Sequence, residues 1–131
     1  MSVLVDSNIL IYYINGQLPP AARACFENAV VAGASYSSIT RIEVMGWAGH
    51  TPASRQLTQN LLSHMQEIPL AEAVIVQTIQ LREQHRIKLP DAIIAASALA
   101  HGRVLMTRNG GDFAACGVQL LDPWDARPSP A

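Results

Sequence analysis

The chain has little cysteine and little charge of either sign, and both shortages exclude common functional classes. Cys25 and Cys116 are the only cysteines among 131 residues, and their wide separation matches no zinc-binding pair. We expect two reduced, largely buried thiols, with a cysteine nucleophile as the weaker alternative. Charged residues make up 15% of the chain and the formal net charge is −1. A broad basic surface for nucleic acid is therefore not indicated, although nine Lys and Arg can still form a local patch.

Long apolar runs are absent as well. No segment approaches the roughly 18 consecutive apolar residues of a membrane span. The N-terminus lacks the basic flank and the apolar core of a signal peptide. These two absences predict a cytoplasmic protein with no membrane segment. The four histidines form no His-x-x-x-His pattern, so we expect them at the surface or at helix ends rather than on a metal.

What the chain does have is enough apolar residues for a single folded domain. Half of the residues are hydrophobic, which at this length supports a substantial core. Short apolar segments alternate with helical patterns, as in a parallel sheet covered on both faces. We therefore expect an α/β fold, a three-layer sandwich with a short parallel sheet of about four or five strands. One domain is expected over residues 1–124, and a loose Pro-rich tail over residues 125–131.

Apolar periodicity, caps and glycines predict the individual elements. The expected strands are residues 1–5, 34–37, 67–70, 103–107 and 118–121. The expected helices are residues 9–14, 20–32, 38–49, 52–65, 71–85 and 90–101. Ser7 or Asn8 is expected to cap the first helix and Thr51 the fourth, and residues 108–112 are expected to form a polar loop. In the fifth helix, one side is expected to carry Val74, Ile75, Thr78 and Ile79.

Four of the ten acidic residues stand out by their positions: Asp6, Glu43, Asp91 and Asp112. Asp6 directly follows the first apolar strand, and Asp112 follows residues 103–107 after a short loop. Glu43 and Asp91 are expected near helix beginnings, where the helix dipole favours an anion. At least three of the four lie in apolar segments that we expect in the core, where an unpaired carboxylate costs several kcal/mol. Since sites in such sheets form outside the carboxyl ends of the strands, the four acids are expected to converge on one edge.

Carboxylates gathered in this way repel one another and raise each other's pKa, and a divalent cation relieves that repulsion. Oxygen ligands suit Mg²⁺ or Mn²⁺, which can lower the pKa of a bound water and polarise a phosphoryl oxygen. The combination suits phosphodiester hydrolysis. Arg41 or Arg108 is a candidate for holding the phosphates of the substrate.

Each acid also has a purely structural interpretation. Asp6 taken alone is a good helix N-cap, although Ser7–Asn8 could serve as the cap instead. Glu43 could form an ion pair with Arg41 or Arg108. We favour a ligand role for Asp6 because it directly follows a buried strand and Ser7–Asn8 can cap the helix instead. For Glu43 we favour a ligand over an ion pair.

The two later acids have structural interpretations of the same kind. Asp91 follows a proline in the first turn of a helix, where an acid is favourable in any case. Asp112 lies in a Gly-rich loop, where turn chemistry favours Asp. Only their combination with the other two acids indicates function.

Four segments together resemble a known family. They are Val-Asp-Ser-Asn-Ile-Leu at residues 5–10, Ile-Glu-Val at 42–44, Leu-Pro-Asp-Ala-Ile-Ile-Ala-Ala at 89–96 and Thr-Arg-Asn-Gly-Gly-Asp-Phe at 107–113. In order and spacing they resemble PIN-domain ribonucleases, and the short chain looks most like the VapC-type toxins of bacterial toxin–antitoxin pairs. The resemblance covers the chain to about Trp124. Each motif alone is weakly specific, but the four motifs in this order are strong evidence for the resemblance.

The resemblance implies a Mg²⁺- or Mn²⁺-dependent endoribonuclease, held silent by a cognate antitoxin protein and usually a homodimer. By position, the core metal ligands would be Asp6, Glu43 and Asp91, and Asp112 would complete the acidic site, often through water. The residues that would orient the ligands or shape the loop are Asn8, Thr107 and Asn109. No departure from the family pattern suggests an inactive copy.

Two other functions compete with the nuclease. One is a PIN-like module that holds metal or RNA without cutting. The other is a phosphoacceptor receiver domain, which expects paired acids after the first strand and a lysine on a late strand. Here Ser7–Asn8 follows Asp6, and the only lysine is Lys88, before a helix. The receiver domain is therefore the weaker alternative.

Overall fold

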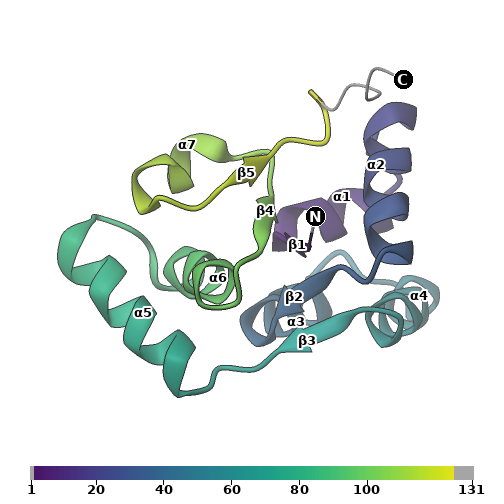
Figure 1. The fold of residues 1–131 in the computed structure, drawn as a ribbon. Coiled ribbons are helices and arrows are strands. Elements are labelled where there is room, and N and C mark those ends of the chain that lie inside the picture. The colour runs from purple at the N-terminus through teal and green to yellow at the C-terminus, as the bar shows by residue number, and fades with distance from the viewer. Residues whose placement is uncertain (1, 126–131) are drawn as a thin grey trace.

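A five-stranded, fully parallel sheet lies at the centre of the computed structural model, which describes residues 2–125 (Figure 1). The strands are β1 (Val3–Val5), β2 (Ser35–Ser37), β3 (Gln66–Ile68), β4 (Val104–Met106) and β5 (Leu120–Leu121). Their order across the sheet is β3-β2-β1-β4-β5. The central strand β1 pairs Leu4 with Ser35 on one side and with Leu105 on the other. A receiver domain has the order 2-1-3-4-5, so this topology contradicts that alternative.

Helices cover both faces of this sheet (Figure 1). They are α1 (Ser7–Ile14), α2 (Pro20–Val31), α3 (Ser38–Met45), α4 (Pro52–Ser63), α5 (Glu72–Gln84), α6 (Leu89–Ala100) and α7 (Gly110–Phe113), with a 3-10 turn at Ala114–Cys116. Side chains alternate between the two faces of a strand. Val3 and Val5 accordingly pack with apolar residues of α1 to α4, whereas Leu4 packs with residues of α5 and α6. The three-layer α/β prediction is confirmed.

The predicted start of α4 and the predicted end of α6 agree with the structure to within one residue. Thr51 caps α4 in a reciprocal capping box with Ser54, whose amide lies 3.1 Å from the Thr51 hydroxyl. Gly102 follows α6 with a φ of 64°, a left-handed conformation that favours glycine. Helix α6 also carries four fully buried alanines, which let neighbouring backbones approach closely: Ala92, Ala95, Ala96 and Ala98.

Four predictions about these elements are wrong. Helix α1 begins at Ser7 with Asp6 in the N-cap position, so neither Ser7 nor Asn8 is the cap. Helix α3 ends at Met45 rather than near residue 49. The expected loop at residues 108–112 contains the start of α7. In α5 the buried residues are Val74, Thr78 and Leu81, whereas 38% of Ile75 and 52% of Ile79 are exposed.

Two further predictions concern the ends of the chain and the membrane. Asp125, the first residue of the expected tail, is exposed, and residues 126–131 lie outside the described part. Among residues 2–125, no helix combines the length and the apolar character needed to cross a bilayer.

Candidate active site

Asp6 is the most deeply placed of the four acids. Three buried apolar residues of β1 precede it, and its own amide continues the sheet pairing by donating to the Met106 carbonyl at 2.9 Å. Only 4% of Asp6 is exposed. Its side chain does not cap α1. Instead, its Oδ2 accepts a 2.8 Å hydrogen bond from the Thr107 hydroxyl, just beyond β4. The carboxylate therefore lies between the carboxyl ends of the two central strands.

The environment of Asp6 raises its pKa from 3.8 to about 6. Burial is the largest cause, because a charged carboxylate loses hydration in the interior. Hydrogen bonds from the Thr107 hydroxyl and the Ser7 amide act in the opposite direction. The negative charges of Asp91 and Glu43 then raise the pKa further. Three of the four acids are thus close enough to influence one another.

Glu43 reaches the site from the last turn of α3, not from a helix beginning as predicted. At this end the helix dipole disfavours an anion, so side chains must hold the carboxylate. The Ser7 hydroxyl lies 2.7 Å from Glu43 Oε1 and 2.9 Å from the Thr40 hydroxyl. An ionised carboxylate can only accept. The single Ser7 proton therefore goes to Glu43, which leaves the Thr40 hydroxyl to donate to Ser7.

Ser7 and Thr40 are site residues that sequence reasoning missed. Both are buried, and together they orient Glu43 from two different helices. A weak signal was present for Thr40, which lies three residues before Glu43 and so on the same face of α3. Ser7 carried no such signal, because its position suggested a helix cap.

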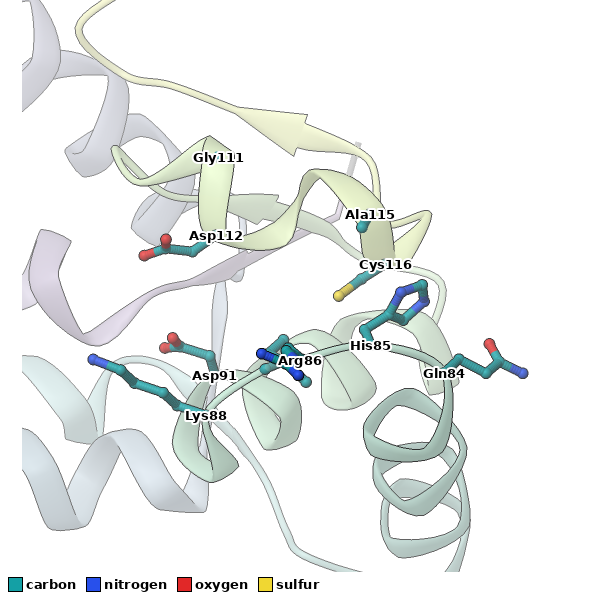
Figure 2. A pocket seen from close by; sticks show the side chains of 10 residues that line it. Gln84, His85, Arg86, Lys88, Asp91, Gly111, Asp112, Ala115 and Cys116 are labelled. Carbon is teal, nitrogen blue, oxygen red and sulfur yellow. The ribbon is translucent and has the colours of Figure 1, made fainter.

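Asp91 and Asp112 complete the acidic group. Asp91 lies in the first turn of α6 and is half-buried, and Asp112 lies on α7 and is exposed. Burial raises the pKa of Asp91, and the charges of Asp112 and Glu43 raise it further, while Lys88 lowers it. Figure 2 shows the Asp91 and Asp112 side chains extending into the same hollow from opposite elements. The structure therefore brings all four predicted acids to one edge of the sheet.

The acids are less buried than the sequence indicated. We expected at least three of them in the core, but only Asp6 is buried, and Glu43 and Asp112 are exposed. The reason is that Glu43, Asp91 and Asp112 lie on helices, where the residue that follows each acid (Val44, Ala92 or Phe113) is buried while the acid itself lies nearer the surface.

The supporting residues differ in their involvement. Thr107 accepts a 3.0 Å hydrogen bond from the Asn109 amide while donating to Asp6, so its hydroxyl ties the loop after β4 to the carboxylate. Asn109 occupies the N-cap position of α7, with no side-chain cap bond. Asn8 is exposed on α1. Thr107 is thus the supporting residue with a visible contact to an acid.

None of the four acids is neutralised by a basic side chain within residues 2–125. The ion pairs there join Arg23 to Glu27 at 3.6 Å and Arg41 to Glu67 at 3.0 Å. The alternative that Glu43 pairs with Arg41 or Arg108 is therefore wrong. The carboxylates remain unpaired anions that repel each other.

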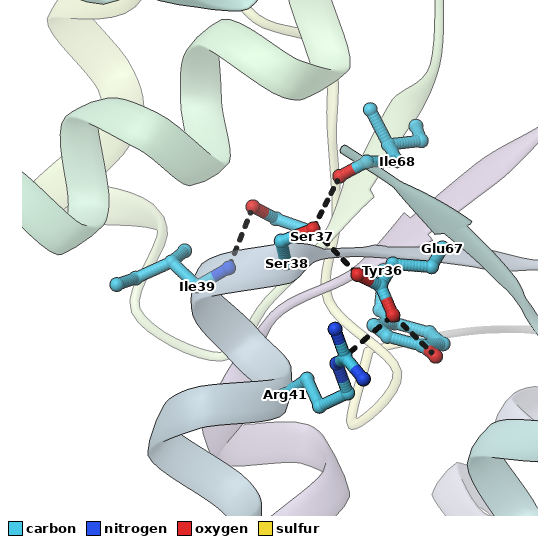
Figure 3. Close-up of polar contacts among 7 residues, drawn as sticks. All are labelled: Tyr36, Ser37, Ser38, Ile39, Arg41, Glu67 and Ile68. Carbon is cyan, nitrogen blue, oxygen red and sulfur yellow. Dashed lines mark hydrogen bonds and ion pairs between the residues drawn. The ribbon is translucent and has the colours of Figure 1, made fainter. Parts of the chain in front are cut away.

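The two arginines proposed for phosphate binding have other partners. Arg41 pairs with Glu67, which also accepts hydrogen bonds from Tyr36 and Ser38 at 3.3 and 2.6 Å (Figure 3). The Arg108 guanidinium lies 4.2 Å from the centre of the Trp124 ring, a cation–π contact. The pairing with Glu67 weakens the case for Arg41, and both phosphate roles stay predictions.

A hollow of about 500 Å³ opens beside Asp91 and Asp112. Its walls are the segment between α5 and α6, the start of α6, and the segment from α7 to the 3-10 turn (Figure 2). Cys116 faces it, and burial together with the nearby Asp91 charge raises the pKa of this thiol. Burial also raises the pKa of Cys25. Both cysteines are free thiols, as predicted.

The donor set fits a hard divalent cation that keeps much of its water. Within the described residues, no three His, Cys, Asp or Glu side chains are gathered tightly enough to enclose a metal ion. Mg²⁺ does not require such a cage, because one or two carboxylates commonly hold it together with several waters. Asp6 and Asp91 meet that need, because their pKa values are raised and neither forms an ion pair within residues 2–125.

The sheet order and the acids at its edge define a class, and comparison with known proteins identifies it. Residues 3–117 match the sequence model of the PIN domain. The chain belongs to the PIN domain family.

Solved structures of similar fold include a chain of a toxin–antitoxin complex. A chain of a toxin–antitoxin complex from Klebsiella pneumoniae is 32% identical, with 95% of this chain and 99% of that chain covered and a TM-score of 0.74. DNA-bound VapBC from Salmonella typhimurium gives a TM-score of 0.80 at 23% identity, with 94% and 98% covered. FitAcB from Neisseria gonorrhoeae gives 0.77 at 24% identity, with 95% and 99% covered. The last two likenesses show the fold alone.

A curated relative matches over a shorter stretch. The plasmid stability protein StbB of Pseudomonas syringae pv. tomato is 45% identical over 40 residues, which is 30% of this chain. The match spans 29% of the length of that relative.

Proposed function

We propose that this protein is a metal-dependent endoribonuclease that acts as the toxin of a bacterial toxin–antitoxin pair. The observation that carries the nuclease proposal is the group of four acids, none of which forms an ion pair within residues 2–125. Burial, together with the charges of Asp91 and Glu43, raises the pKa of Asp6 in this group to about 6. Perturbed carboxylates gathered beside a hollow are typical of a reactive site. Membership of the PIN domain family supports the same conclusion.

The residues of the chain have separable roles in this proposal. Asp6, Glu43 and Asp91 would hold Mg²⁺ or Mn²⁺, and Asp112 would act through water. The bound ion would supply a Lewis acid for the phosphoryl group and a water of lowered pKa.

Two hydroxyl groups would keep the ligands in place. Thr107 fixes the orientation of the Asp6 carboxylate, and Ser7 fixes that of Glu43. Since hydroxyl donors favour the charged form of a carboxylate, they also keep the ligands ready to bind a cation.

The partner proposal depends on the relatives. The Klebsiella pneumoniae chain was solved in a toxin–antitoxin complex, and we infer a cognate antitoxin for this chain and a homodimeric toxin in the cytoplasm. RNA is the proposed substrate. The single-stranded regions of RNA are the natural targets, because their bases and backbone are accessible.

An RNA cleavage assay tests the nuclease proposal. We expect the purified protein to cut a single-stranded RNA in Mg²⁺ or Mn²⁺, to stop in EDTA, and to resume when Mg²⁺ is restored in excess, because the carboxylates need the ion. Cleavage that continues in EDTA would contradict the metal site. A protein that never cuts RNA under any of these ions would contradict the nuclease.

A binding module that does not cut is the second candidate. It is favoured by the absence, within residues 2–125, of a tight three-ligand metal cluster. Tight RNA binding in Mn²⁺ with no cleavage would favour this candidate over the enzyme.

A further inference from the structure

We propose that Arg86 and Lys88 form a phosphate-binding subsite that holds the backbone of single-stranded RNA beside the acidic residues. The proposal rests on the proposed function, since it names how the substrate of that same site is held. It also moves the phosphate contacts from Arg41 and Arg108 to a segment that sequence reasoning did not single out.

The position of the two cations is the first support. Both line the hollow of about 500 Å³ that Asp91 and Asp112 also line. Figure 2 shows the Lys88 side chain beside Asp91, and Arg86 on the same segment as Lys88. The Lys88 charge is close enough to lower the pKa of Asp91. A hollow of this size lies within the usual range for small-ligand sites, so a nucleotide-sized group can occupy it.

The availability of the two cations is the second support. Neither takes part in an ion pair within residues 2–125. Both side chains are exposed. Arg41, in contrast, is held by Glu67 at 3.0 Å, and Arg108 lies over Trp124. The donors of Arg86 and Lys88 can therefore turn to a phosphate without breaking an existing pair.

The segment that carries Arg86 and Lys88 is anchored by the residue between them, Ile87. Residues 86–88 lie between the end of α5 and the start of α6 and have no helical structure. Ile87 packs against the apolar cluster formed by α5, α6 and β4. The backbone is extended at His85 and Lys88, with ψ values of 152° and 147°. Ile87 is half-buried, and Arg86 and Lys88 on either side of it are exposed, so Ile87 holds the segment while the two cations face solvent.

Charge balance explains why such a subsite is needed. Four carboxylates repel a polyanion, and the formal net charge of −1 provides no general attraction. A local pair of cations beside the acids offsets that repulsion on the side where they lie. The RNA backbone would then cross the hollow with one phosphate on Arg86, a neighbouring phosphate on Lys88, and the nucleotide between them toward Asp91.

Salt-dependent RNA binding tests the subsite independently of cleavage. Binding of a short fluorescein-labelled single-stranded RNA is measured by fluorescence anisotropy in EDTA over a range of salt concentrations. Each lost phosphate contact flattens the slope of log K against log salt by about 0.7 for single strands. We expect Arg86→Gln/Lys88→Gln to bind about tenfold more weakly at low salt, with a slope flatter by about 1.4.

The matched control removes two positive charges elsewhere. Arg55 and Arg82 are exposed, and neither lines this hollow. Arg55→Gln/Arg82→Gln is therefore expected to keep the wild-type slope. Circular dichroism establishes that both double variants are folded.

The outcomes separate this proposal from the nuclease. Equal slopes for the wild type and Arg86→Gln/Lys88→Gln would overturn the subsite, even if the protein cuts RNA. An equal effect of the Arg55/Arg82 control would overturn it too, since general charge would then explain the loss. So would undetectable binding by the wild type, because the proposed contacts need no metal. If the protein never cuts RNA but Arg86→Gln/Lys88→Gln has a flatter slope of log K against log salt than the wild type, the subsite is supported and the nuclease proposal fails.

Discussion

Asp6→Asn is expected to lower the rate of RNA cleavage by more than about a hundredfold. Residues that only support a metal ligand already change affinity or activity by roughly 10–100-fold, and Asp6 is proposed as a ligand itself. Asn keeps the shape of the side chain and an oxygen that can accept the Thr107 hydrogen bond of 2.8 Å. It removes the negative charge, so it weakens the metal site without removing the packing.

The same substitution is expected to stabilise the metal-free fold at neutral pH. A pKa raised from 3.8 to about 6 means that ionised Asp6 destabilises the folded state by up to about 3 kcal/mol. Asn removes this destabilising charge but is a poorer hydrogen-bond partner for the Ser7 amide. We therefore expect the free energy of unfolding to increase by about 1–3 kcal/mol. Most substitutions of buried residues destabilise, and a gain here would be diagnostic of a site built for a cation.

Cleavage assays in Mg²⁺ and urea unfolding in EDTA measure the two halves of this prediction. Asp125→Asn is the matched control, because Asp125 is exposed and takes part in no ion pair among residues 2–125. The control should leave rate and stability unchanged. Wild-type cleavage by Asp6→Asn would exclude Asp6 as a ligand. A loss of stability of about 2 kcal/mol or more at neutral pH would instead make Asp6 a structural residue.

The second large effect is a loss of stability as the pH rises from about 4 to about 6 in the absence of metal. The pKa of Asp6 is higher in the folded state than in the unfolded chain, so the folded state binds more protons in this window. Its stabilising contribution is present below about pH 3.8 and lost as the pH passes about 6. Asp91 acts in the same direction, because its pKa is raised as well.

Urea unfolding at several pH values in EDTA measures this effect as a difference. Subtracting the free energy of unfolding of Asp6→Asn from that of the wild type cancels the contribution of the other titrating groups, which the two proteins share. We expect the two to approach equal stability near pH 4 and to differ by about 1–3 kcal/mol at pH 7. A difference that is independent of pH would show that folding does not shift the pKa of Asp6.

Saturating Mg²⁺ at pH 7 should restore stability in the wild type but not in Asp6→Asn. An ion at 100 times its dissociation constant stabilises the folded state by about 2.7 kcal/mol. Equal stabilisation of both proteins would place the ion at another site.

Much of the fold could be predicted because local pattern and tertiary structure agree. The β1 segment is apolar at every position, and only a strand buried on both faces explains that pattern beside predicted helices. Placing Asp6 at the end of β1 then required no further information. Thr51 at the start of α4 was predictable for the same reason, since its cap is local.

The errors arise where tertiary contacts outweigh local preference. Gly110 and Gly111 indicated a loop, yet α7 forms there because Phe113 is 1% exposed and anchors the turn in the core. The buried face of α5 is set by its packing on α6, which left Ile75 and Ile79 outside.

The candidate site shows the same division. The four acids were found because each stands in a segment with a recognisable sequence pattern. The Ser7–Glu43 hydrogen bond joins residues 36 positions apart, and the periodicity of the sequence cannot predict a contact at that separation. The hollow that Arg86 and Lys88 line exists only once α7 and the 3-10 turn fold beside the α5–α6 segment.

Anomalous diffraction from crystals soaked in Mn²⁺ would test most directly whether these carboxylates form a metal site. A difference peak about 2.0–2.2 Å from an Asp6 or Asp91 oxygen is the expected result, with Glu43 and Asp112 in direct or water-mediated contact. An empty edge at saturating Mn²⁺, or a peak found only elsewhere on the protein, would contradict the metal site on which the proposed nuclease depends.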